Sequence, residues 1–149
     1  MSKGTRSSVL FICLLFVAPL MCAADSLTEW ERGIFMEIVQ TWHEMLYTIP
    51  RGSSSSSKDI DNIYQQVATK YSITLAEVKR INTKGTATEP SEQDYLIYDE
   101  YLKQFGALPQ GRTTDDVRRL HVAVANQFGI SLARLHEIEY LMEEGFWGL

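Results

Sequence analysis

The sequence predicts an all-α fold, and three observations support that prediction. At four predicted helix starts a Ser or Thr stands three residues before a carboxylate, which is the pattern of a helix capping box. Apolar residues after these places recur at intervals of three and four, the period of a helix face. No stretch alternates apolar and polar residues at the two-residue period of a strand. The four boxes are Ser26–Glu29, Thr74–Glu77, Ser91–Asp94 and Thr113–Asp116.

The first 24 residues have the composition of a secretory signal peptide. A basic start precedes an apolar run over 9–21, and small residues follow at positions 22 and 24. We expect cleavage between Ala24 and Asp25, which makes the mature chain secreted or periplasmic. The apolar run is shorter than the roughly 20 residues of a spanning helix. We therefore expect no stable membrane span after cleavage, and a membrane anchor if the signal is retained.

Cleavage also changes the chemistry available to the mature chain. Cys13 and Cys22 are the only cysteines, so both leave with the signal and no disulfide or thiolate site is expected. Loss of Lys3 and Arg6 from the 14 basic residues leaves 12 against 19 acidic residues, a net charge of -7. Such an acidic chain is a poor nucleic-acid binder, because phosphate recognition needs a basic surface.

A long helix is predicted at the start of the mature chain, which we expect to form a single domain over 25–149. This helix covers 26–47 within an N-terminal segment 25–50, and a serine-rich linker over 51–58 follows it. One face of the helix is apolar, as expected of a helix that packs on a core. The residues of that face are Trp30, Ile34, Ile38, Trp42 and Met45.

Two αα-hairpins over 59–83 and 113–144 are predicted to be copies of an internal repeat. Their helices cover 58–71, 74–83, 114–128 and 131–144. Alignment of Ala68 with Ala125 also places Ser72 on Gly129, where each hairpin turns. The spacing is like that of a helix-turn-helix, in which apolar residues pack two helices across a tight turn. Because neither second helix is strongly basic, we interpret the pattern as packing and expect no nucleic-acid partner.

A tyrosine-rich helix over 91–106 is predicted to be the central helix of the fold. Loops over 84–90 and 106–111 flank it, as their glycines and prolines indicate. Its aromatic residues suit either a core or a partner surface. An aromatic tail over 145–149 either folds back or serves as a docking peptide. The candidate binding residues are Tyr95, Tyr98, Tyr101, Phe146 and Trp147.

The segment from Ala68 to Asn82 resembles the two-helix half of a LysM module, a domain that binds peptidoglycan or chitin. The matching pattern is Ala68-x2-Tyr71-Ser72-Ile73-Thr74-x2-Glu77-Val78-x2-Ile81-Asn82. The stretch Tyr47–Gly52 is similar to the opening strand of that module. The resemblance implies binding to a cell-wall glycan.

The three histidines are weak evidence for a metal site. His43 and His136 each begin the pattern of the zinc-protease helix, which needs a second histidine at the fifth position. Both fifth positions hold tyrosine, Tyr47 and Tyr140. The three histidines could meet in space as a three-nitrogen site, but we expect separate side chains, no metal and no cofactor.

Catalysis has little support in the sequence. The many glutamates could supply a carboxylate pair for glycoside cleavage, although such residues usually lie on solvated faces or at helix starts. No nucleophile elbow, phosphate-binding glycine loop or nucleotide fingerprint is present. The candidate carboxylates are Glu29, Glu31, Glu37, Glu44, Glu77, Glu100, Glu137, Glu139, Glu143 and Glu144.

The sequence thus favours an exported, non-enzymatic helical protein that binds a protein partner. A LysM-like glycan-binding module is the first alternative, and a small hydrolase that uses clustered carboxylates is the second. The identity of the partner and the oligomeric state are left open.

Overall fold

The computed structural model describes residues 26–48 and 57–147, and within them the side chains of 26–48 and 59–144. Six helices and no strand make up this part of the chain, which confirms the all-α prediction. The signal segment with its cleavage site at Ala24 and Asp25 lies outside the described residues, as does most of the serine-rich linker. The helices are α1 (Glu29–Thr48), α2 (Ser57–Tyr71), α3 (Leu75–Thr86), α4 (Glu92–Ala107), α5 (Thr114–Phe128) and α6 (Leu132–Trp147).

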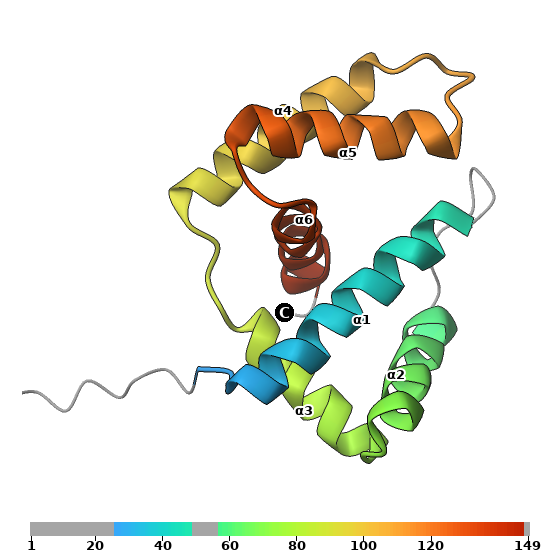
Figure 1. Ribbon diagram of the computed structural model, residues 1–149, viewed down its shortest axis with the longest axis vertical. Helices are drawn as coiled ribbons and strands as arrows, with labels where there is room; N and C mark the ends of the chain where they lie inside the picture. The colour runs from blue at the N-terminus through green and yellow to red at the C-terminus, as the bar shows by residue number, and fades with distance from the viewer. Residues whose placement is uncertain (1–25, 49–56, 148–149) are drawn as a thin grey trace, which may run out of the picture.

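The helices form two groups that share α6, which runs between them (Figure 1). One core lies among α1, α2 and α3 and includes Tyr140 and Leu141 of α6. The other lies among α4, α5 and α6 and includes Leu135, Ile138 and Met142. The central helix is therefore α6, which packs on α1, α3, α4 and α5, whereas α4 packs mainly on α5 and α6. The prediction of a central tyrosine-rich helix is corrected accordingly.

The capping boxes begin the helices much as expected, with one shift and one incomplete box. At α3 the Thr74 side chain accepts from the amide of Glu77, whose carboxylate bonds Arg80 instead of the Thr74 amide. Ser91 with Asp94 and Thr113 with Asp116 form complete boxes at α4 and α5. At α1 the box is Thr28 with Glu31 instead of Ser26 with Glu29, with hydrogen bonds of 2.8 and 3.2 Å in the two directions. Glu31 forms the box in place of Glu29 because Glu31 is buried at this end of α1 and also pairs with cations of α3.

The two hairpins turn in the same way. In α2–α3 the amide of Ile73 donates to the carbonyl of Ala68, and in α5–α6 the amide of Ile130 donates to Ala125, both at 3.0 Å. Each turn places one residue in the left-handed region, Ser72 at φ 54° and Gly129 at φ 65°. These are Schellman motifs, which end a helix and satisfy its last carbonyls.

The helix α3 extends into the segment predicted as a loop. Its last turn contains Lys84 and Gly85, and Gly85 is buried against the ring of Phe35 on α1. Because glycine has no Cβ, α3 can approach α1 closely at this point. Lys84 also bonds Glu31 at 3.0 Å, so tertiary contacts hold the turn that composition alone disfavours.

The helix α6 likewise passes its predicted end. It continues through Trp147 and so takes in three residues of the expected tail 145–149. The side chains of Phe146 and Trp147 lie outside the described part of the chain, so their proposed docking role stays a prediction.

Replacement of Gly85 by alanine should destabilise the protein by about 1–3 kcal/mol, because the added Cβ would overlap the buried ring of Phe35. Urea unfolding followed by circular dichroism measures this change. Gly33→Ala on α1 is the matched control, because its Cβ would meet nothing within 4 Å and should stabilise the helix by up to about 1 kcal/mol. Equal effects of the two substitutions would contradict the close approach of α3 to α1.

Candidate metal centre

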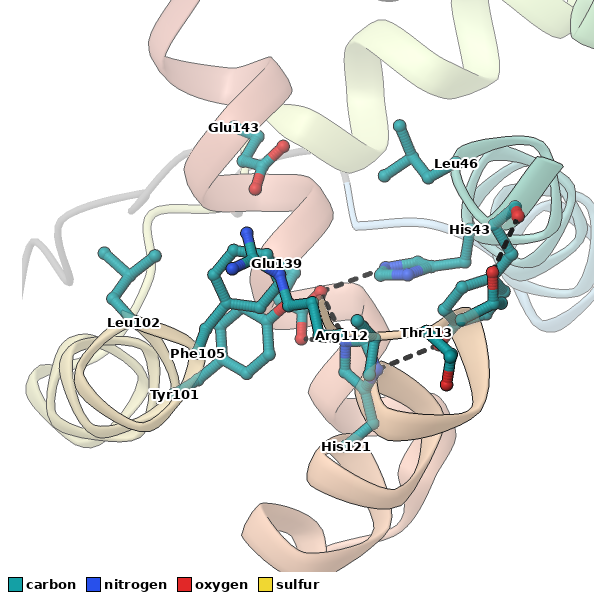
Figure 2. Close-up of a pocket in the computed structure, with 13 residues that line it drawn as sticks. His43, Leu46, Tyr101, Leu102, Phe105, Arg112, Thr113, His121, Glu139 and Glu143 are labelled. Carbon is teal, nitrogen blue, oxygen red and sulfur yellow. Dashed lines mark hydrogen bonds and ion pairs between the residues drawn. The ribbon is translucent and has the colours of Figure 1, made fainter. Parts of the chain in front are cut away.

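A pocket of about 310 Å³ lies where α1, α4, α5 and α6 meet, and we call it the interhelix pocket (Figure 2). Histidine, tyrosine and glutamate side chains from three helices line its inner part, and aromatic and aliphatic residues of α4 line one wall. The loop before α5 contributes an arginine. The lining residues are His43, Leu46, Tyr47, Tyr101, Leu102, Phe105, Arg112, Thr113, Thr114, Val117, His121, Glu139 and Glu143.

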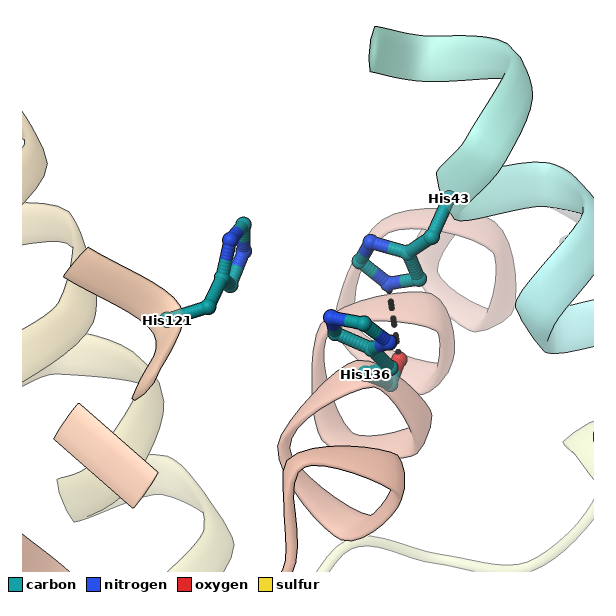
Figure 3. A group of neighbouring side chains, drawn as sticks. All are labelled: His43, His121 and His136. Atoms are coloured by element: carbon teal, nitrogen blue, oxygen red, sulfur yellow. Dashed lines mark hydrogen bonds between the residues drawn. The ribbon is translucent and has the colours of Figure 1, made fainter. Parts of the chain in front are cut away.

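The structure brings the three histidines together from three helices, so the expectation of separate side chains is wrong. One nitrogen each of His43 on α1, His121 on α5 and His136 on α6 lies within 4.8 Å of the others. The rings of His43 and His136 stack with centroids 4.0 Å apart (Figure 3). The ring of His121 faces this stack nearly at right angles, with centroids 5.8 and 5.2 Å from the two rings. We call these three residues with Glu139 the histidine centre.

Hydrogen bonds fix the orientation of two of the rings. Nε2 of His43 lies 3.1 Å from the backbone carbonyl of His136, so this nitrogen donates and Nδ1 keeps its lone pair. His121 lies between Tyr47 and Glu139, with Nδ1 2.9 Å from the Tyr47 hydroxyl and Nε2 2.9 and 3.0 Å from the two carboxylate oxygens. Carbonyl, hydroxyl and carboxylate groups that bond an imidazole in this way typically orient histidines that bind a metal ion.

His136 supplies a polar atom that the fold leaves unused. Its Nε2 is buried and has no hydrogen-bond partner among the described residues. Buried polar atoms without a partner are rare, because their desolvation costs free energy that no contact offsets. A ligand bound at the histidine centre would satisfy this nitrogen.

Burial keeps two of the imidazoles neutral. Burial, together with the neighbouring His136 and His121 and against the hydrogen bond to the His136 carbonyl, lowers the pKa of His43 to about 3. Burial and His121 likewise lower the pKa of His136 to about 4. Both rings are therefore unprotonated at neutral pH, which is the state that binds metal ions.

Two carboxyl groups of α6 face the same pocket one helical turn apart. Burial raises the pKa of Glu139, although the hydrogen bond from His121 opposes this effect. Burial, followed by the charge of Glu139, raises the pKa of Glu143 to about 7. Of the ten glutamates considered from sequence, these two line the interhelix pocket. Glu31 and Glu137 are also buried, and arginine partners compensate them. Glu31 lies at the start of α1, which agrees with the expectation of carboxylates at helix starts, whereas Glu137 and Glu139 lie neither on a solvated face nor at a helix start.

The predicted binding tyrosines of α4 have three different environments. Tyr95 is 47% exposed, as a partner surface requires. Tyr98 is half-buried, with its hydroxyl 3.5 Å from Glu143. Tyr101 is buried in the second core and stacks on His121 with ring centroids 5.0 Å apart. Tyr101 therefore supports the histidine centre and is not available to a protein partner.

Sequence reasoning gave no role to Tyr47 or Arg112, and it named Glu139 only as one of ten candidate carboxylates. The signal for Glu139 was its spacing of three residues from His136, which puts both side chains on one face of a helix. The tyrosine that interrupts the zinc-protease pattern after His43 is Tyr47, and it bonds His121. The corresponding tyrosine after His136, Tyr140, packs in the first core and donates to Asn82.

Comparison with known proteins identifies no relative: no family model, curated protein or solved structure matches this chain. Among the described residues, no helix combines the length and the apolar character that crossing a membrane requires. The interpretation of the centre therefore rests on its own geometry.

Lowering the pH should destabilise the metal-free protein through His43. The unfolded ring protonates near pH 6.5 and the folded ring near pH 3, so the unfolded state binds more protons between these values. From pH 7 to pH 5 the free energy of unfolding should fall by about 2 kcal/mol more in the wild type than in His43→Gln. Urea unfolding of both proteins in EDTA at the two pH values measures the difference. The same loss in both would show that His43 titrates normally in the folded protein.

Proposed function

We propose that this chain is an exported binding protein that holds a divalent transition-metal ion at the histidine centre. The observation that carries the proposal is the convergence of three imidazole nitrogens within 4.8 Å from three different helices. Two of these rings stay neutral at pH 7, and the third lies against the buried carboxylate of Glu139. Export rests on the signal-like composition of the first 24 residues.

Zinc fits this donor set best. Three imidazoles and one carboxylate are ligands that Zn²⁺ accepts in a tetrahedral arrangement, with bonds of about 2.0–2.2 Å. The nitrogens would move together by roughly 1 Å to reach that geometry. Mg²⁺ and Ca²⁺ prefer oxygen ligands, and thiolate-dependent sites need cysteine, which occurs here only at positions 13 and 22.

The surrounding hydrogen bonds are compatible with metal binding. The ion would take the place of the proton between Nε2 of His121 and Glu139, and Nδ1–H of His121 would then donate to the Tyr47 hydroxyl. Nδ1 of His43 would ligate while Nε2 continues to donate to the carbonyl of His136. Each imidazole that ligates zinc usually donates its other nitrogen to such a group.

Zinc should bind one to one and raise the melting temperature of the purified protein. His43→Gln, His121→Gln and His136→Gln should each weaken zinc binding by at least about tenfold, because each removes one ligand. Competition with a chromophoric chelator gives the affinity, and the visible spectrum of bound Co²⁺ reports tetrahedral geometry.

Tyr95→Ala is the control for these variants, because Tyr95 is exposed and belongs to α4, which contributes no residue to the histidine centre. It should bind zinc as the wild type does. Unchanged zinc affinity in all three histidine variants would refute the proposed centre.

A partner protein and a glycan also remain proposals for the outer surface. The exposed apolar side chains of α4, Tyr95 and Leu96, favour a protein partner. The helices α2 and α3 supply the LysM-like segment, but Tyr47 and Thr48, its expected opening strand, belong to α1. We also propose that the two hairpins descend from one repeated unit, since both end their first helix in the same hydrogen-bonded turn.

A second candidate function, glycoside hydrolysis, is favoured by the pairing of Glu139 and Glu143 in one pocket. A carboxyl group with a pKa of about 7, as at Glu143, suits a general acid. A panel of nitrophenyl glycosides tests this alternative. Turnover that Glu143→Gln abolishes without loss of zinc would support the hydrolase, and no turnover of any substrate would favour the binding protein.

A further inference from the structure

Within the described part of this acidic protein, Arg112 is a cation without a carboxylate partner. Of the lysines and arginines whose side chains the structure describes, it alone has no carboxylate within 4 Å. Its guanidinium carbon instead lies 4.2 Å from the ring centroid of Phe105, on the wall of the interhelix pocket. Arginine presents a planar set of donors that matches a carboxylate, so this position offers a counter-ion to a ligand.

The walls around Arg112 suit the apolar body of a small molecule. Leu102 and Phe105 contribute aliphatic and aromatic surface to the pocket (Figure 2). Val117 also lines it, and Leu102 is 45% exposed. The volume of about 310 Å³ lies at the lower end of the roughly 300–1,000 Å³ of small-molecule sites. A ligand about the size of a single ring or a short acyl chain would fit.

The acidic groups of the pocket restrict the charge of that ligand. Glu139 and Glu143 line it from α6 and supply no positive charge, so a second negative charge near α6 would gain no favourable partner from them. Thr113 and Thr114 line the same pocket but already donate their hydroxyl hydrogens to Asp116 and to the Tyr47 carbonyl, so recognition of an anion falls to Arg112. The arrangement selects one negative charge beside Arg112 and an uncharged body elsewhere.

We infer that the interhelix pocket binds a small monocarboxylate with an aromatic or aliphatic body, and that Arg112 pairs with its carboxylate. The inference does not depend on the metal ion, since Arg112 and the wall of α4 are separate from the metal ligands. It adds an organic ligand to the proposed metal ion, and the binding of each can be tested separately.

Isothermal titration of the purified protein in EDTA tests the inference with phenylacetate, benzoate and hexanoate and with their primary amides. At least one acid should bind saturably, and its amide should bind at least about tenfold more weakly, because a charge-assisted pair is lost. Arg112→Gln should weaken binding of the acid by a similar factor. Arg119→Gln, an equal loss of charge at an exposed position of α5, is the matched control and should bind as the wild type does.

Three results would overturn the inference: no saturable binding of any acid, equal affinity for acid and amide, or unchanged affinity in Arg112→Gln. Thermal melting of both variants verifies that they are folded. Zinc affinity, measured on the same proteins, should be unchanged by Arg112→Gln. If zinc binds and no acid does, the organic ligand alone is rejected. If an acid binds and zinc does not, the metal centre alone is rejected.

Discussion

The burial of α6 between two groups of helices is the constraint on which the rest of the structure depends. Its apolar residues serve both cores, with Tyr140 and Leu141 in one and Leu135, Ile138 and Met142 in the other. Because almost no face of the helix between Leu135 and Met142 is left to solvent, its carboxylates are buried with the apolar residues. A buried charge is costly unless it is paired. Glu137 is paired by Arg32 and Arg134, and Glu139 lies against His121.

The same burial shifts the pKa values of the groups in the histidine centre. Desolvation lowers the pKa values of His43 and His136, raises that of Glu139, and so favours uncharged groups over isolated ions. A divalent cation would reverse this balance by supplying positive charge that stabilises the carboxylate and uses the imidazole lone pairs. The unused nitrogen of His136 shows that the protein's own hydrogen bonds do not complete the centre.

Local patterns predicted the helices well and their ends less well. The complete boxes at Ser91 and Thr113 lie where the spacing of Ser or Thr and Asp placed them, because a capping box involves only four consecutive residues. The last turn of α3 was missed because its stability comes from Phe35 and Glu31 on another helix. The tyrosines of α4 predicted that this helix would be central. The central helix is α6, and its many polar residues did not suggest a buried helix.

The sequence by itself determined the helical fold, the starts of most helices and the acidic balance, since these follow from short-range spacing and composition. Only the tertiary structure decided the candidate site. His43, His121 and His136 come from three helices, and their nearest pair in sequence is 15 residues apart, too far for any local pattern to join them. Their meeting depends on the angles at which α1, α5 and α6 pack, and those angles are set by side chains throughout both cores.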